Sequence, residues 1–384
     1  MDRWIDEVEL HASASEAAGL TDFGHPHYLD GLRAFIESAV RDANLNSAGR
    51  QNAQGLAGLF LRNRLLLAEE RKRRPAVFER PLVPPIIVFG LPRTGTTLLH
   101  RLLALDPAHS AVPLWELLRP IQYETPDRRR EIAVEGDRQQ EELRRDYDRV
   151  HYTRADTPEE CVILLATTFC SALFSVFLPV FGYAKWGLTS DKSQVYVEYR
   201  ELLQILQAVR PGLRLTMKSP AHMAALPALV AAIPDALLIQ THRDPVPACI
   251  SAMSNCRALQ TPFVEAFDVP RMAEEILHSL ATSIDRSMAF RTDYPGSVCD
   301  VQYDQLATAP AATIRAIYAH FNLPWSDVFA ERLDGYVRDN PQTKHGRHTY
   351  NATEFGVAEE QIAARFSEYR ERFGFTSDAR RAVC

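Results

Sequence analysis

The sequence lacks the cysteine patterns that hold together small secreted domains and structural zinc sites. Its six cysteines are scattered over 384 residues, and no two of them form a Cys-x-x-Cys pair. A disulfide framework or a zinc site needs cysteines at close, repeated spacings. We therefore expect neither, and a reducing cytoplasm is the simplest location for such a chain.

An excess of positive charge is also missing. The chain has 43 lysines and arginines against 49 acidic residues, so its formal net charge is −6. Nucleic acids and anionic membranes are attracted by a basic field. No nucleic-acid partner is expected, and a site for an anionic ligand would have to be local.

The chain begins without an apolar leader, because Met1–Glu7 reads MDRWIDE, and we expect no secretory signal. The one long uncharged run is Cys161–Phe181, which has the length of a membrane span. The two motifs described below lie on either side of it, so a single crossing would separate them. We expect no transmembrane span; core packing, a pocket wall and a peripheral membrane contact are left open for this run.

Short apolar runs alternate with helical patterns from residue 86 onward. Strands alternating with helices predict an α/β fold with a mostly parallel sheet covered on both faces. The predicted strands are Ile86–Phe89, Leu213–Met217, Ala236–Gln240 and Ser297–Gln302, and the predicted helices include residues 96–103, 222–233, 310–321 and 358–373.

The predicted organisation has two parts. Residues 1–80 form an N-terminal helical region, and residues 81–384 form the α/β domain with a mainly helical insertion at residues 121–210. We expect the two parts to behave as one structural unit. The sequence indicates no oligomeric state.

A glycine loop follows the first predicted strand and leads into a helix. It reads GLPRTGTT from Gly90 to Thr97, which fits the spacing G-x-x-x-x-G. Backbone N–H groups of such a loop, together with the following helix N-terminus, cradle a phosphate-like anion. This motif predicts a three-layer fold of the P-loop type, with the anion held by Arg93, Thr94, Gly95, Thr96 and Thr97.

The loop departs from that of nucleotide hydrolases at one position. These proteins carry lysine after the second glycine, whereas this chain has Thr96 there and places its cation, Arg93, inside the loop. Transfer of a doubly charged phosphoryl group normally uses Mg²⁺. A sulfuryl group carries about one charge, so protein cations can suffice, and Arg93 could stabilise a departing phosphate.

A second anion site is predicted after the strand that ends at Gln240. The sequence continues THRDPVPACIS, with Arg243 at the strand end and Ser251 eight residues later in a helix. An arginine and a serine in this arrangement could hold one phosphate group between them. In isolation, the same residues could instead be a helix cap followed by a surface arginine.

Together the two motifs resemble those of the 3′-phosphoadenosine-5′-phosphosulfate (PAPS)-dependent sulfotransferases. The first has the Pro-Arg-x-Gly-Thr-Thr form of tyrosylprotein and many bacterial sulfotransferases, and Arg243 with Ser251 resembles the 3′-phosphate motif. The resemblance implies transfer of a sulfuryl group from PAPS to a hydroxyl or amine of a small acceptor. The product is 3′-phosphoadenosine-5′-phosphate (PAP), and no metal is required.

Four further residues follow from the resemblance. Lys218 matches a lysine that contacts the transferring group, and Tyr303 matches a tyrosine that packs on adenine. Lys344 and Arg347 lie where a basic, glycine-containing segment covers the 3′-phosphate. Independently of the family, the loop, Lys218, Arg243 and Tyr303 each follow a predicted strand, and parallel sheets bind ligands at those ends.

The residue that would accept the acceptor's proton has two candidates. The family's small-molecule enzymes have a histidine where this chain has Pro220, and His222 lies two residues further on. Glu116 resembles the base of tyrosylprotein sulfotransferases, and burial beside Trp115 could raise its pKa toward a useful range. A third alternative is that neither residue is the base.

The nature of the acceptor is inferred from the insertion, since inserted segments above a sheet edge usually supply specificity. The uncharged run at Cys161–Phe181 predicts a largely apolar acceptor, with a polar one such as a sugar as the alternative. Two other functions stay open: a P-loop kinase acting on a small molecule, and a nucleotide-binding regulatory protein without catalysis.

Overall fold

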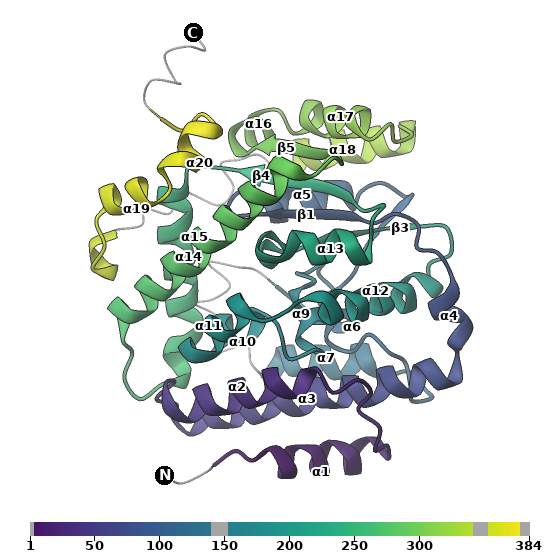
Figure 1. The fold of residues 1–384 in the computed structure, drawn as a ribbon. Helices are drawn as coiled ribbons and strands as arrows, with labels where there is room; N and C mark the ends of the chain where they lie inside the picture. The colour runs from purple at the N-terminus through teal and green to yellow at the C-terminus, as the bar shows by residue number, and fades with distance from the viewer. Residues whose placement is uncertain (1–3, 140–152, 341–351, 377–384) are drawn as a thin grey trace. The chain divides into compact units, whose positions relative to one another are not determined.

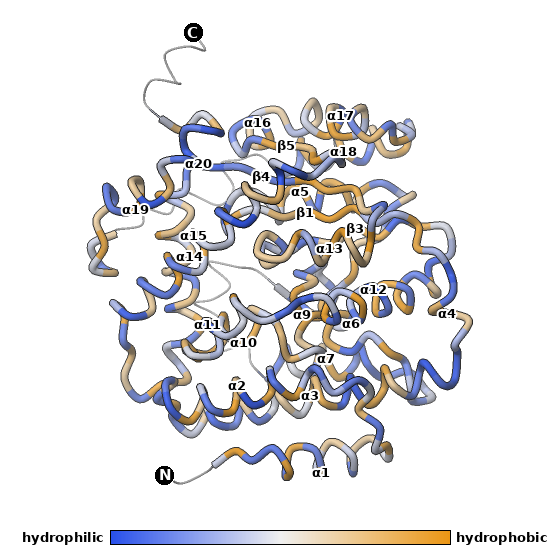
Figure 2. The backbone as a smooth tube through the Cα atoms, in the orientation of Figure 1, coloured by the Kyte–Doolittle hydropathy of each residue, from blue (hydrophilic) through white to orange (hydrophobic). Residues whose placement is uncertain are grey.

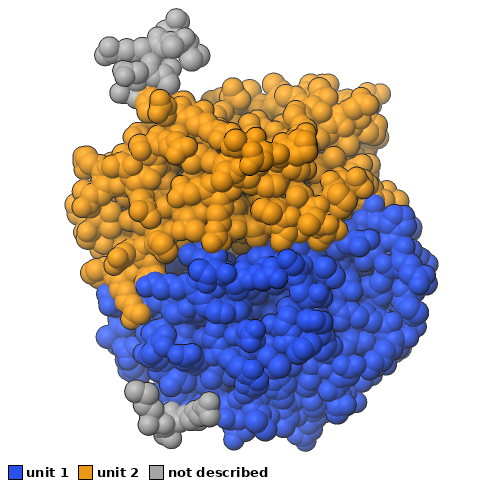
Figure 3. Space-filling model, in the orientation of Figure 1, with its two compact units in different colours: residues 1–82, 112–211, 255–268 blue, residues 83–111, 212–254, 269–384 orange. Residues whose placement is uncertain are grey.

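The computed structural model describes residues 4–139, 153–340 and 352–376. They form two compact units, each assembled from separate stretches of the chain (Figure 3). Unit 1 falls within residues 1–82, 112–211 and 255–268, and unit 2 within residues 83–111, 212–254 and 269–384. The expected division at residue 80, with residues 121–210 as an insertion in one structural unit, stays a prediction.

Unit 1 is built from helices (Figure 1). Its N-terminal region begins with capped helices, since Asp6 accepts hydrogen bonds from the first turn of α1 and Asn46 from that of α3. The helices are α1 Glu7–Ala18, α2 Tyr28–Arg41, α3 Ser47–Arg73, α4 Pro75–Glu79, α6 Leu114–Leu118, α7 Arg129–Gln139, α9 Val162–Ala166, α10 Leu173–Phe177, α11 Phe181–Thr189, α12 Ser193–Ala208 and the 3₁₀ helix η2 Thr261–Phe263.

The uncharged run at residues 161–181 is broken into short pieces in the core of unit 1. Helices α9 and α10 have five residues each, and Phe169 between them has a left-handed φ of 53°. Phe174 packs against the rings of Phe35, Phe60 and Tyr183. No helix within the described residues is long and apolar enough to cross a membrane.

A buried ion pair joins α3 to α12. The Arg64 guanidinium lies 2.7 Å from Glu198 Oε2, and the two side chains are 1% and 0% exposed. Burial alone would raise the pKa of Glu198, but the nearby Arg64, His27 and Arg71 together lower that pKa. Because removing one partner would leave a buried uncompensated charge, this pair constrains how α3 and α12 pack.

Unit 2 contains a sheet of five parallel strands in the order β2-β3-β1-β4-β5. The strands are β1 Ile86–Gly90, β2 His109–Ala111, β3 Arg214–Lys218, β4 Leu237–His242 and β5 Val298–Gln302. The four strands expected from the sequence are present within two residues at each end. The three-residue edge strand β2 was not expected, because it has no apolar run of its own.

Helices cover both faces of this sheet, as expected. Alternate residues of β1 point to opposite faces, and Ile86 and Val88 pack with α5, α16, α17 and α18 in one apolar cluster. The 3₁₀ helix η1 packs on β1, and α15 packs on η1. The apolar strand β1 is drawn in hydrophobic colours in Figure 2. The elements are α5 Thr96–Leu103, η1 Pro220–Ala225, α13 Leu226–Ala232, α14 Pro245–Gln260, α15 Val269–Asp293, α16 Tyr303–Thr308, α17 Pro310–His320, α18 Asp327–Asp339, η4 Ala352–Phe355, α19 Glu359–Arg365 and α20 Ser367–Arg372. Helix α14 begins in unit 2, and its residues from Asn255 on belong to unit 1.

Two predicted helices are each divided in two. The segment expected at residues 222–233 begins earlier, as η1, because Ser219 caps it and Pro220 occupies its first position. The helix expected at residues 358–373 is interrupted at Phe366, whose backbone leaves the helical region. Apolar periodicity indicates both helical segments, but it does not show where a helix is interrupted.

Candidate functional site

The carboxyl ends of four neighbouring strands lie at one edge of the sheet in unit 2 (Figure 1). Gly90 of β1 is in register with Thr241 of β4, and His242 of β4 with Gln302 of β5. On the other side, Val88 pairs with Lys218, the last residue of β3. The predicted anion-binding groups therefore start from adjacent strand ends, where open parallel sheets bind ligands.

The loop after β1 has the strained backbone of an anion cradle. Arg93 and Gly95 have left-handed φ angles of 68° and 88°, and α5 begins directly afterwards at Thr96. A Cβ on Gly95 would lie 2.9 Å from Tyr303 Cδ2, so this position needs glycine for space as well as for φ. The Thr94 hydroxyl donates to Leu91 O at 2.6 Å.

Arg243 links this loop to the end of β5. Its Nη1 donates to the backbone oxygen of Arg93 at 3.0 Å, and its guanidinium lies 4.2 Å from the centroid of the Tyr303 ring. Such a stacked arginine is ordered and still offers further N–H groups. The structure therefore brings together three residues that the sequence predicted separately, Arg93, Arg243 and Tyr303.

Ser251 and Lys218 are buried in the same unit. Ser251 lies in the second turn of α14 and is 2% exposed, and its hydroxyl makes no hydrogen bond. A buried polar atom without a partner costs free energy unless a ligand or water satisfies it. Lys218 is 1% exposed at the end of β3. These residues fit a site for an anionic ligand.

Comparison with known proteins decides the family. The profile described as the sulfotransferase family matches residues 84–327, which include the loop, Lys218, Arg243, Ser251 and Tyr303. The chain belongs to the sulfotransferase family. The family expected from the two motifs is thus confirmed, while the loop subtype stays a prediction.

Relatives of this sulfotransferase include mycobacterial enzymes. The omega-hydroxy-beta-dihydromenaquinone-9 sulfotransferase Stf3 of Mycobacterium bovis is 24% identical over 304 residues, covering 76% of this chain and 75% of that protein. The crystal structure of sulfotransferase STF1 from Mycobacterium tuberculosis H37Rv has a TM-score of 0.81 and 28% identity, covering 96% of this chain and 100% of that one. Sulfotransferase STF9 from Mycobacterium avium has a TM-score of 0.85 and 25% identity, covering 97% of both chains. The predicted α/β fold of the P-loop type is confirmed.

The two candidate bases of the sulfotransferase differ in their surroundings. His222 lies in η1 of unit 2, and complete burial lowers its pKa to about 3, which makes it a weak proton acceptor. Glu116 lies in α6 of unit 1 and is buried, and Arg210 donates to both of its carboxylate oxygens, one of them at 2.9 Å. Glu116 and the nucleotide-binding candidates thus belong to different units.

Lys344 and Arg347 lie outside the described residues. Among the residues that are described, no group of three or more histidines, cysteines or carboxylates is arranged to hold a metal ion.

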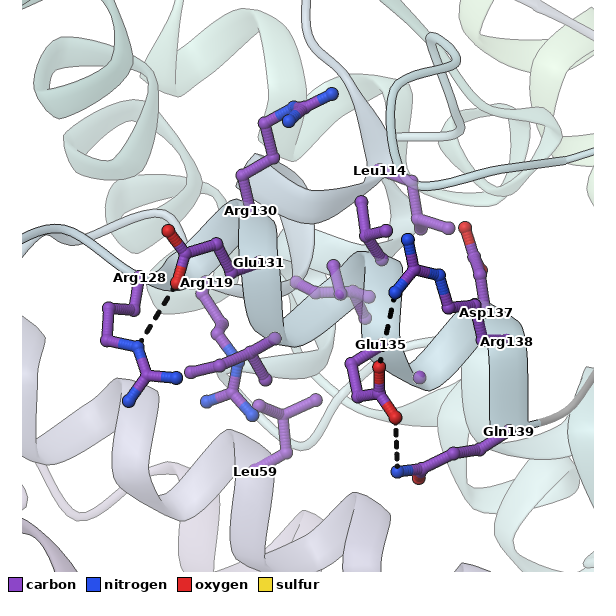
Figure 4. Close-up of a pocket in the computed structure, with 15 residues that line it drawn as sticks. Leu59, Leu114, Arg119, Arg128, Arg130, Glu131, Glu135, Asp137, Arg138 and Gln139 are labelled. Carbon is purple, nitrogen blue, oxygen red and sulfur yellow. Dashed lines mark hydrogen bonds and ion pairs between the residues drawn. The ribbon is translucent and has the colours of Figure 1, made fainter.

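A cavity of about 740 Å³ lies in unit 1 beside α6 and α7 (Figure 4). Its wall combines apolar side chains with arginines, most of which are paired; Arg130, for example, binds Asp156 at 2.6 Å. Residues 161–181, most of which are buried, do not line it. Its described lining is Leu59, Leu114, Leu118, Arg119, Arg128 and residues 130–139.

Sequence reasoning missed the polar residues that support the loop. The Thr241 hydroxyl lies 2.6 Å from that of Thr94. The sequence did contain an indication of them, because the apolar strand β4 ends in three consecutive polar residues, Gln240 to His242. All three are buried in the structure. Buried polar side chains at a strand end indicate either a ligand or a hydrogen-bond network.

Proposed function

We propose that this sulfotransferase moves the sulfuryl group of PAPS to a hydroxyl or amine of a small, largely apolar acceptor in the cytoplasm. The products are PAP and a sulfated acceptor. The observation that carries the proposal is the link from Arg243 to both the loop oxygen of Arg93 and the Tyr303 ring. It ties the proposed 3′-phosphate, phosphosulfate and adenine contacts to one sheet edge.

The donor would be held by groups of unit 2. The loop N–H groups and the N-terminus of α5 would bind the 5′-phosphosulfate. Arg243 and the unpartnered hydroxyl of Ser251 would bind the 3′-phosphate, with Lys344 and Arg347 covering it. Tyr303 would pack on the adenine.

The transfer would proceed by attack of the acceptor oxygen or nitrogen on sulfur. The bond from sulfur to the bridging oxygen breaks, and its electron pair stays on the departing phosphate of PAP. Arg93 and Lys218 would stabilise the charge that develops on that phosphate and on the sulfuryl group. Glu116 would take the proton of the acceptor, with His222 as the alternative, and we propose that no metal takes part.

Two observations favour an apolar acceptor. The related Stf3 is named for a hydroxylated menaquinone derivative. In addition, Ile132 and Val134 of α7, in the proposed acceptor-binding insertion, line a cavity. Leu114 and Leu118 line the same cavity. Mixed apolar and charged walls suit a molecule with an apolar body and a polar group.

The test is a transfer assay with labelled PAPS and matched apolar alcohols, phenols and sugars. We expect labelled product with the apolar alcohols or phenols. Turnover with sugars alone would contradict the acceptor class. Transfer from ATP with Mg²⁺ instead of PAPS would indicate a kinase, and thermal stabilisation by PAP without any transfer would indicate a regulatory protein.

The cavity wall gives a further prediction. Ile132→Asp should raise the KM for an apolar acceptor about 5–30-fold, because it places a charge against an apolar ligand, which costs about 1–2 kcal/mol. The affinity for PAP should stay unchanged. Steady-state kinetics and calorimetry measure the two quantities.

Val197→Asp is the matched control. Val197 and Ile132 are both 43% exposed, but Val197 lies on α12 and does not line the cavity. Equal kinetic effects of the two substitutions would show that the cavity does not receive the acceptor.

A further inference from the structure

A network of hydrogen bonds lies beside Arg243 at the end of β4. His242, the residue before it, is fully buried. Its Nε2 lies 2.7 Å from Asp300 Oδ1 of β5, and its Nδ1 lies 2.9 Å from the Tyr369 hydroxyl of α20. That hydroxyl also faces the backbone N–H of Arg243, the next residue in the sequence after His242.

An ion pair fixes the Asp300 end of this hydrogen-bond network. Arg291 of α15 donates to both oxygens of Asp300, at 2.6 and 2.7 Å. Burial alone would raise the pKa of Asp300, but the hydrogen bonds from His242 and Arg291 hold that pKa well below its usual range. Asp300 is therefore ionised and acts only as an acceptor.

Because Asp300 is ionised, it determines which atom donates and which accepts in each hydrogen bond of the network. His242 is neutral near pH 7, because burial lowers its pKa despite the carboxylate, so its single N–H is on Nε2 and points to Asp300. Nδ1 is then an acceptor, and the Tyr369 hydroxyl donates to it. The lone pairs of that hydroxyl oxygen are then free to interact with the backbone N–H of Arg243.

Helix α20 also holds the residues on either side of Arg243. The Phe373 ring, directly after α20, stacks on His242 with centroids 3.9 Å apart. The Arg370 guanidinium pairs with Asp244, its Nε lying 3.3 Å from Oδ1. Three consecutive residues, His242 to Asp244, are thus fixed by one short C-terminal segment.

We infer that Tyr369 is a positioning residue for the 3′-phosphate contact, and that α20 thereby contributes to selectivity for nucleotides carrying a 3′-phosphate. The inference rests on the proposed function, in which Arg243 binds that phosphate. A guanidinium discriminates by geometry, and its geometry follows from the backbone that carries it. In the proposed function, Tyr369 contacts neither the nucleotide nor the sulfuryl acceptor and acts through Arg243.

The test compares the calorimetric affinities of PAP and AMP. Tyr369→Phe keeps the ring packing and removes the hydroxyl, and we expect it to reduce the preference for PAP over AMP about three- to tenfold, the effect of one hydrogen bond. In the background of Arg243→Ala, the same substitution should leave the PAP/AMP ratio unchanged. Non-additivity of this kind distinguishes positioning from a general loss of stability.

Tyr183→Phe is the matched control. It removes an equally buried hydroxyl in unit 1, bonded to the backbones of Phe169 and Ser171, and should lower the melting temperature without changing the PAP/AMP ratio. Arg370→Gln is a second variant at a partly exposed position, and it should change the ratio in the same direction as Tyr369→Phe.

Each outcome has one meaning. If the parent protein binds PAP and AMP equally, the proposed function fails. If the parent prefers PAP but every folded variant of α20 keeps that preference, only the inference about Tyr369 is overturned. The inference would also be overturned if Tyr369→Phe reduced the PAP/AMP ratio equally in the parent protein and in the Arg243→Ala variant.

Discussion

Replacing Glu116 by glutamine is expected to lower kcat about 10²–10⁴-fold, the usual contribution of a general base. Glutamine has nearly the same shape and can still accept a hydrogen bond from Arg210, but it cannot accept the acceptor's proton. The affinity for PAP should stay almost unchanged, because the proposed nucleotide contacts lie in unit 2. Steady-state sulfation assays and calorimetry on the same preparation check both statements.

Two further variants make this result interpretable. Arg210→Gln breaks the same ion pair but leaves the carboxylate of Glu116, so it should retain much more turnover than Glu116→Gln. Equal losses of turnover in Arg210→Gln and Glu116→Gln would indicate that Glu116 has a structural role. His222→Gln should have little effect, since an imidazole whose pKa is lowered to about 3 is a weak base. If only the His222 variant loses turnover, the order of the two candidates is wrong.

Replacing Arg243 by alanine is expected to erase most of the preference for PAP over AMP. Each charge-assisted hydrogen bond to the 3′-phosphate is worth about 1.5–3 kcal/mol, which corresponds to about 10–150-fold in affinity. AMP lacks this phosphate, so its affinity should change much less. Calorimetric titration of both nucleotides into the parent and the variant measures the difference directly.

Substitutions that separate charge from geometry sharpen the experiment. Arg243→Lys keeps the charge but loses the planar fork and the stacking on Tyr303, so it should give an intermediate preference for PAP. Arg338→Ala removes a positive charge from an exposed site and should leave both affinities unchanged. Comparable affinities for PAP and AMP in the parent protein would contradict the assignment of Arg243.

Much of the fold follows from local patterns in the sequence. Strands β1 and β4 begin with short apolar runs, which form strands where they are buried on both faces, whereas β3 and β5 mix apolar and polar residues. The loop from Gly90 to Thr97 was recognisable because its chemistry depends on spacing within eight residues. Parallel pairing then placed the strand ends at one edge, without knowledge of any contact.

The pairing of distant polar residues was not predictable in the same way. Glu116 and Arg210 are 94 residues apart, Arg64 and Glu198 are 134 apart, and His242 and Tyr369 are 127 apart. A side chain's partner across such separations depends on how whole elements pack. Sequence patterns therefore indicated Glu116 as a base but did not indicate Arg210 as its partner. They also did not indicate that α20 supports Arg243.

The sequence by itself determined the alternation of strands and helices, the loop that can cradle an anion, and the family, because each depends on the order of neighbouring residues. The tertiary structure decided that residues 161–181 are mostly buried and do not line the observed cavity. It also decided that His222 is fully buried and that His242 and Asp300 form a network. These properties arise from burial and from partners distant in the chain, which only the packed structure brings together.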